Sequence, residues 1–177
     1  TDLASDFRAA LVSAFDLSMP AVAEKKLSVD GSAKYRLVLA DGAQIEMVLM
    51  PQDKKQTLCV STQVGCSRAC AFCATGRMGR KRDLAVHEIV QQVLLAASEA
   101  EPALTNLVFM GMGEPLDNLD NVLEAVSLIQ HERALAFSPR RVTVSTCGIV
   151  PGIQRLAESG LKVKLAVSLN STRDEVR

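Results

Sequence analysis

Hydrophobic runs and amphipathic stretches alternate along the chain from about residue 56 onward. Short runs rich in Val, Leu and Thr indicate strands, and longer stretches with apolar residues three or four positions apart indicate helices. The expected strands are 57–61, 105–111, 140–146 and 162–169, and the expected helices are 84–99, 119–131 and 151–159. This alternation predicts an α/β fold with a parallel sheet and right-handed crossovers.

The first 50 residues follow a different pattern. Residues 3–15 have helical spacing with one apolar face, and a second short helix is expected over residues 18–26. Two apolar runs on either side of Asp41 and Gly42 then predict a β-hairpin, because Asp-Gly is a strong signal for a tight turn.

These patterns divide the chain into two expected parts. Residues 1–50 would form an accessory unit of helices and a hairpin, and residues 51–177 would form the α/β core. A parallel sheet of about four strands has an open edge and a half-covered apolar face. We therefore expect the chain to be a truncated sequence or a fragment of a longer protein.

Charge and composition limit the class of protein. The formal net charge is zero, so any binding of nucleic acid requires a local basic patch. The five cysteines are an odd number with three of them close together, which favours a reducing compartment over a disulfide framework. Neither a signal peptide nor an apolar stretch of about 18 residues is present, so we expect a cytoplasmic protein that does not interact with a membrane.

Three cysteines in the pattern C-x3-C-x2-C provide the strongest chemical signal. Cys66, Cys70 and Cys73 follow the first expected core strand. Three thiolates can ligate three irons of a 4Fe-4S cluster and leave the fourth iron open to a ligand. The spacing, with Phe72 before the third cysteine, is similar to the signature of the radical S-adenosylmethionine (radical SAM) enzymes. We expect the three sulfurs to converge within a few ångströms.

Two other interpretations of the cysteines stay open. A structural zinc site usually needs four ligands in two pairs, and no second Cys or His pair lies nearby. The three cysteines could also be packing residues of a core.

Further motifs follow the other expected strands. In MGMGEP, Gly111 and Gly113 would allow a ligand to approach the backbone, and Glu114 could hold a cationic group. Ser145, in STCG, could bond a ribose or a carboxylate, while Cys147 is interpreted as a packing residue. A basic segment could hold phosphates at the mouth of a site or be a solvated face; its residues are Arg68, Arg77, Arg80, Lys81 and Arg82.

Four segments together resemble one family closely. They are TLCVSTQVGCSRACAFCATG, LVFMGMGEPLDNLDNV, RRVTVSTCGIVPGI and LAVSLNSTRDEVR, and the resemblance covers about residues 30–177. The chain is similar to the RlmN family, whose members are radical SAM enzymes that methylate carbon 2 of an adenine in 23S rRNA and in some tRNAs. The sister family Cfr, which methylates carbon 8, shares much of this framework.

The resemblance implies a fold, cofactors and site residues. The fold would be a partial (βα)6-type barrel, and Cys66, Cys70 and Cys73 would bind a 4Fe-4S cluster. The catalytic residues would be Cys59, as the second catalytic cysteine, and Glu46, as a proton acceptor. Positions matching the SAM-binding residues of the family are Gly113, Glu114, Ser145, Ser168, Leu169 and Asn170. Many members have His where this chain has Asn170.

The resemblance also implies a mechanism and partners. Two SAM molecules would be used in a ping-pong cycle, through a methylated cysteine and a protein–RNA crosslink that Cys59 resolves by forming a disulfide. The methyl-carrying cysteine is expected beyond residue 177, which would leave this chain catalytically incomplete. The partners would be 23S rRNA, tRNA and a flavodoxin-like one-electron reductant, and the protein would be a monomer. Two alternatives stay open: a radical SAM enzyme with another chemistry, such as an activase, and a non-catalytic iron–sulfur protein.

Overall fold

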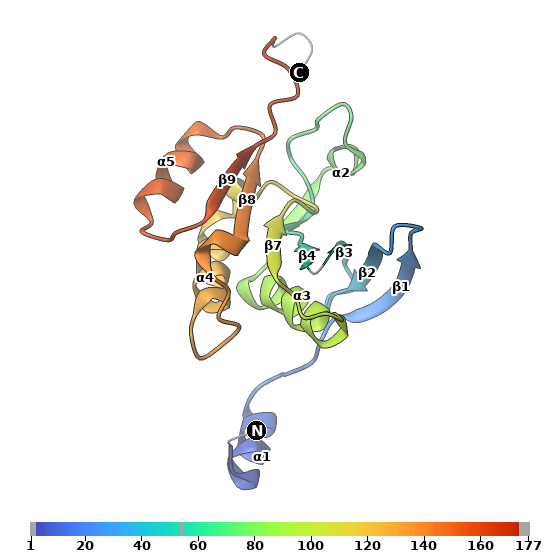
Figure 1. Ribbon diagram of the computed structural model, residues 1–177, viewed down its shortest axis with the longest axis vertical. Helices are drawn as coiled ribbons and strands as arrows, with labels where there is room; N and C mark the ends of the chain where they lie inside the picture. Colours follow the sequence, from blue (N-terminus) through green and yellow to red (C-terminus); the bar gives the residue numbers. More distant parts are fainter. Residues whose placement is uncertain (1–2, 54, 174–177) are drawn as a thin grey trace.

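The computed structural model describes residues 3–53 and 55–173, which form a seven-stranded sheet with helices packed on it (Figure 1). The sheet order is β1-β2-β3-β4-β7-β8-β9. Its first four strands are antiparallel: β1 (Ala21–Leu27), β2 (Ala33–Val38), β3 (Gln44–Gln52) and β4 (Lys55–Cys59). The strands β7 (Asn106–Phe109), β8 (Val142–Thr146) and β9 (Lys164–Val167) then continue from β4 in parallel.

The helices connect the parallel strands as the sequence predicted. They are α3 (Val86–Glu99), α4 (Leu119–Gln130) and α5 (Val150–Glu158), with two short 3₁₀ turns, η1 (Pro115–Asn118) and η2 (Pro139–Arg141). The expected α/β fold with parallel strands is confirmed. In the described residues, no helix is long and apolar enough to cross a membrane.

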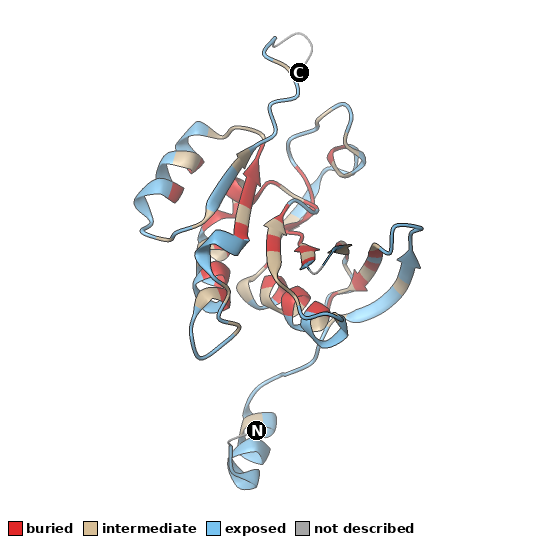
Figure 2. Ribbon diagram, in the orientation of Figure 1, coloured by how far each residue is buried: buried red, intermediate tan, exposed pale blue. Residues whose placement is uncertain are grey.

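The core lies between one face of the sheet and the helices, where buried residues concentrate (Figure 2). Alternate strand residues such as Leu58, Leu107 and Val144 are fully buried there against Ile89 of α3 and Val126 of α4. The intervening strand residues line a hollow of about 390 Å³ on the other face, and they include Thr57, Val108 and Thr143. One face of the sheet is therefore sealed, and the other is open to a ligand or to more protein.

The N-terminal part differs from the prediction in one element. The helix α1 (Ser5–Ala14) and the β2–β3 hairpin are confirmed. The second helix expected over residues 18–26 is wrong, because β1 occupies Ala21–Leu27 and pairs with β2. The residues Ala, Glu and Lys of this segment favour helix, but intrinsic propensity is a small effect, and backbone pairing with the free edge of β2 outweighs it.

A small second sheet carries the three clustered cysteines. It consists of β5 (Gln63–Gly65) and β6 (Arg80–Asp83), paired antiparallel, with the short helix α2 (Ala74–Arg77) in the loop between them. The sequence did not predict this hairpin. Since β3 spans residues 44–52 and pairs with β4, the main sheet is continuous across residue 50. The division into units 1–50 and 51–177 stays a prediction.

Candidate active site

Most of the predicted site residues line one pocket at the carboxyl ends of the parallel strands. This pocket has a volume of about 270 Å³. Eight of the eleven predicted residues line it: Cys66, Cys70, Cys73, Gly113, Glu114, Ser145, Ser168 and Asn170. In parallel α/β sheets, the carboxyl ends of strands are where ligands bind, because the loops there converge.

The cysteine loop forms one wall of this pocket. Its base is closed by a hydrogen bond of 3.2 Å from the Cys66 backbone N–H to the Gly79 carbonyl, and within it the Cys73 N–H donates to the Cys70 carbonyl at 3.0 Å. Cys66 is buried, whereas Cys70 and Cys73 are half-buried. Burial raises the pKa of the Cys66 thiol, the Arg68 N–H lowers it, and the nearby Cys73 and Cys70 raise it again.

The three sulfurs do not converge as closely as predicted. In the part of the chain that the structure describes, no three His, Cys, Asp or Glu side chains form a group that could hold a metal ion. The donor set itself fits a 4Fe-4S cluster, because three thiols from one loop line the same pocket. All five cysteines of the chain are free thiols, so the structure gives no support to the expected disulfide.

Glu114 lines the pocket and is held by backbone donors. It is buried, and its Oε1 accepts a hydrogen bond from Leu116 N–H at 3.1 Å. Its Oε2 accepts from Cys147 N–H at 2.9 Å, which connects the loop after β7 to the loop after β8. The Ser145 and Ser168 hydroxyls lie 3.4 Å apart and connect β8 with the residues that follow β9.

The two glycines of the MGMGEP motif have a packing role. A Cβ at Gly111 would lie 2.6 Å from the Val60 carbonyl oxygen, and one at Gly113 would lie 2.6 Å from the Gln63 Cβ. Gly113 also has a φ of +97°, which side-chain-bearing residues rarely adopt. The prediction that these glycines admit a ligand therefore has a competing explanation, because protein atoms of the β4–β5 segment already occupy the space beside them.

Three predicted residues lie outside this pocket. Cys59 lies on the open face of β4, where its register partners are Val48 and Val108, and burial raises the pKa of its thiol to about 11. Glu46 lies on the same face of β3 and forms an ion pair of 3.0 Å with Lys34. Leu169 is exposed and does not line the pocket.

The basic segment is largely neutralised by carboxylates. Three of its five residues form ion pairs: Arg68 with Asp117, Arg80 with Asp83, and Arg82 with both Glu88 and Asp41. The pairs of Arg68 and Arg82 attach the cysteine loop and β6 to the rest of the protein, whereas the pair of Arg80 and Asp83 lies within β6. Phosphate binding by the whole segment, which the sequence left open, is therefore not favoured.

The sequence did not indicate that Cys147 and Gln63 belong to the pocket region. Cys147 lines the pocket, and burial, followed by the nearby Glu114 carboxylate, raises the pKa of its thiol to about 11. Gln63 is fully buried and bonds the Glu114 backbone at 3.0 Å. Its position three residues before Cys66 is the only feature of the sequence that points to it.

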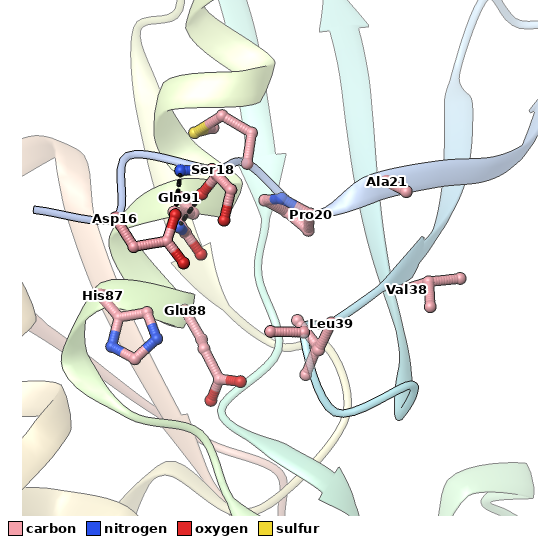
Figure 3. A pocket seen from close by; sticks show the side chains of 11 residues that line it. Asp16, Ser18, Pro20, Ala21, Val38, Leu39, His87, Glu88 and Gln91 are labelled. Atoms are coloured by element: carbon pink, nitrogen blue, oxygen red, sulfur yellow. Dashed lines mark hydrogen bonds between the residues drawn. The ribbon is translucent and has the colours of Figure 1, made fainter. Parts of the chain in front are cut away.

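A second pocket, of about 460 Å³, contains none of the predicted residues (Figure 3). It lies between the segment before β1, the β2–β3 turn and the first turn of α3. Three of its polar side chains are already engaged: Asp16 accepts from Ser18 N–H at 2.8 Å, Gln91 donates to the Ser18 carbonyl at 2.7 Å, and Glu88 binds Arg82. The hydrogen bond from Gln91 to Ser18 attaches the N-terminal segment to α3 beside this pocket.

Comparison with known proteins decides the family. Residues 60–177 match the sequence profile of the radical SAM superfamily. The chain belongs to this superfamily. It is 48% identical over 177 residues to the dual-specificity RNA methyltransferase RlmN of Geobacter sulfurreducens, covering all of this chain and 48% of that protein. It is also 48% identical over 180 residues to the probable dual-specificity RNA methyltransferase RlmN of Thermus thermophilus, covering 51% of it.

A solved structure confirms the fold of this radical SAM chain. The crystal structure of a radical SAM methyltransferase from Sphaerobacter thermophilus superposes with a TM-score of 0.93 and 42% identity, over 99% of this chain and 53% of that one. The resemblance to RlmN that the motifs indicated is thus confirmed. The chain spans about half the length of the curated relatives that it matches.

Proposed function

We propose that this chain is part of an RlmN-type enzyme that methylates carbon 2 of adenosine in 23S rRNA and tRNA. One observation carries the proposal: residues from three separate motifs, Cys66, Glu114 and Ser145 among them, line one pocket at the carboxyl ends of the strands. The names of the relatives at 48% identity supply the substrate class.

The residues of the pocket would hold the two cofactors. Cys66, Cys70 and Cys73 would ligate a 4Fe-4S cluster, which supplies the electron for reductive cleavage of SAM when both are bound. Glu114 offers a carboxylate to the amino group of SAM, and Ser145 offers a hydroxyl to its polar groups.

Cys59 and Glu46 would act on the RNA intermediate from the open face of the sheet. Because Val48 and Cys59 are register partners, Glu46 and Cys59 are diagonal neighbours on one face, about 7–8 Å apart. Glu46 would accept the proton that leaves the adenine ring. The Cys59 thiolate would attack the sulfur of the cysteine that bridges to RNA and form a disulfide. The carbon–sulfur bond of the bridge would break with its electron pair left on the carbon, and protonation of that carbon would give the methylated base.

The cycle requires further participants. None of the five cysteines of this chain is at the methyl-carrying position of the family, so we place that residue outside these 177 residues. A flavodoxin-like protein would supply single electrons. The enzyme would act as a monomer in the cytoplasm, where both RNA substrates occur.

Anaerobic reconstitution tests the proposal. With iron, sulfide and a reductant, the protein should take up about four irons per chain, bind SAM, and show a change in the electron paramagnetic resonance signal of the reduced cluster when SAM is added. The whole protein, given methyl-labelled SAM and unmodified 23S rRNA fragments, should place label on carbon 2 of an adenine. Uptake of stoichiometric zinc without iron, or label on carbon 8, would contradict the proposal.

A further inference from the structure

A buried amide side chain connects the cysteine loop to Glu114. Gln63 lies in β5, three residues before Cys66, and is fully buried. Its Oε1 accepts a hydrogen bond from the Glu114 backbone N–H at 3.0 Å, and its Nε2 donates to Asp83 Oδ1 at 2.7 Å. Both ends of the amide are therefore used, and one of them holds a residue of the candidate site.

The second strand of the cysteine hairpin is part of the same chain of hydrogen bonds. Asp83 is the register partner of Gln63 in the β5–β6 pair, and Arg80 donates to its carboxylate at 3.1 and 2.6 Å. Hydrogen bonds thus connect Arg80 and Asp83 of β6 with Gln63 of β5, and Gln63 with Glu114.

The space around Gln63 leaves little freedom. A Cβ on Gly113 would lie 2.6 Å from Gln63 Cβ and 2.7 Å from Gln63 Cγ, so the residue before Glu114 is packed directly on this side chain. The Gln63 backbone N–H also donates to the Met112 carbonyl at 3.2 Å. Gln63 therefore fixes the backbone of the β7 loop through packing and through two hydrogen bonds.

We propose that Gln63 is a positioning residue that holds Glu114 in place relative to the cysteine loop and thereby sets the affinity of the pocket for SAM. This inference rests on the proposed function, because it takes Glu114 as a SAM-binding group. The Glu114 carboxylate is oriented by Leu116 and Cys147, whereas its backbone is oriented by Gln63. An amide at position 63 is thus needed for Glu114 and the three cysteines to keep a constant relative position.

A matched pair of glutamine variants tests this role. Gln63→Met keeps the length of the side chain and removes its hydrogen bonds. Gln92→Met is the control, because Gln92 is equally buried and its amide bonds the Ser61 N–H and carbonyl at 2.9 and 3.0 Å, without contacting Glu114. Thermal unfolding, iron content and the Kd for labelled SAM by equilibrium dialysis are measured on anaerobically reconstituted protein.

We expect both variants to lose similar thermal stability and to keep their iron. Only Gln63→Met should bind SAM more weakly, by about tenfold, which corresponds to about 1.4 kcal/mol. An unchanged SAM affinity in Gln63→Met, or an equal loss in both variants, would overturn the inference.

Variants of Asp83 test the same connection without altering the core, because this side chain is 28% exposed. Asp83→Ala removes the acceptor of the Gln63 amide and should weaken SAM binding several-fold. Asp83→Asn keeps an Oδ1 acceptor and should restore the wild-type Kd; equal Kd values in the two variants would count against the role of Gln63. If the wild-type protein takes up no iron or binds no SAM, the proposed function fails and this inference fails with it.

Discussion

Replacement of Gly113 by alanine should destabilise the protein far more than the same change at Gly42. Both glycines have positive φ, +97° and +80°. An alanine Cβ at Gly42 meets nothing within 4 Å, whereas at Gly113 it would lie 2.6 Å from Gln63 Cβ and 2.8 Å from Gln63 N. The two variants therefore share the free-energy cost of a side chain at positive φ. They differ in the cost of steric overlap, which only Gly113→Ala has.

The magnitudes follow from these two contributions. A non-glycine residue in the left-handed region costs about 1–2 kcal/mol, which is the whole expected effect for Gly42→Ala. Overpacking a tight site adds about 1–3 kcal/mol, so Gly113→Ala should lower the free energy of unfolding by about 2–5 kcal/mol. Gln63 is fully buried and hydrogen-bonded at both ends, so it cannot move aside to relieve the contact.

Urea unfolding followed by circular dichroism measures both variants. The transition midpoint should fall modestly for Gly42→Ala and steeply for Gly113→Ala, with similar m values. If the two variants were equally stable and Gly113→Ala lost only SAM binding, the packing explanation would be refuted. The glycine would then be required for ligand approach, as the sequence alone indicated.

Two further predictions concern ionisable groups. Burial opposes ionisation of Glu88, but hydrogen bonds from Arg82 and the Ala85 N–H lower the pKa of this carboxyl below 4.5. The ionised carboxylate therefore stabilises the folded protein above pH 4.5. This stabilisation is lost as the pH falls through the lowered pKa of Glu88. Urea titrations between pH 7 and 3 should show a smaller pH dependence for Glu88→Gln than for the wild type, and parallel curves would contradict this. Burial raises the pKa of Cys59 to about 11, so its alkylation by iodoacetamide should be slow at pH 7.5 and accelerate steeply above pH 10. Mass spectrometry measures the rate of alkylation. A rate at pH 7.5 equal to that of an exposed thiol would disprove the raised pKa.

The sequence predicts the parallel part of the fold well because its strands and helices have distinct periodicities. Runs such as TNLVFMG and RRVTVST alternate between a buried face and an open one, and the structure keeps that alternation. The segment Ala21–Leu27 has no such pattern, so its pairing with β2 is decided by contacts that lie elsewhere in the chain. The β5–β6 hairpin is missed for a related reason: strands of three and four residues, QVG and RKRD, are too short and too polar to show a period.

For the candidate site as well, local sequence patterns predict which residues come together, but not the contacts between distant segments that hold them. The cysteine spacing and the order of motifs predict which residues gather at the strand ends, since the ends of parallel strands must meet there. The hydrogen bonds that hold those residues are formed between distant segments. The bond from Gln63 to Glu114, for example, spans 51 positions, and no local pattern around either residue indicates it.

The candidate site is anchored by three consecutive residues before the cysteine loop: Ser61 and Thr62 lie between β4 and β5, and Gln63 begins β5. All three are buried, and Ser61 and Thr62 lie outside the strands, so backbone groups there that no ladder pairs need other partners. Amide side chains supply them: Gln92 binds both backbone groups of Ser61, and Asn118 donates to the Thr62 carbonyl at 2.8 Å.

These amides belong to the helical layer, because Gln92 is in α3 and Asn118 ends η1. The same short segment therefore contacts the helices through Gln92 and Asn118 and the β7 loop through Gln63. Buried polar networks of this kind are stable only when nearly every member is satisfied, so the removal of one amide leaves partners unpaired in the interior. It follows that loss of the Gln63 amide, which bonds Glu114 directly, will alter the geometry of the pocket as well as stability, whereas loss of the Gln92 amide, which bonds Ser61, will lower stability alone.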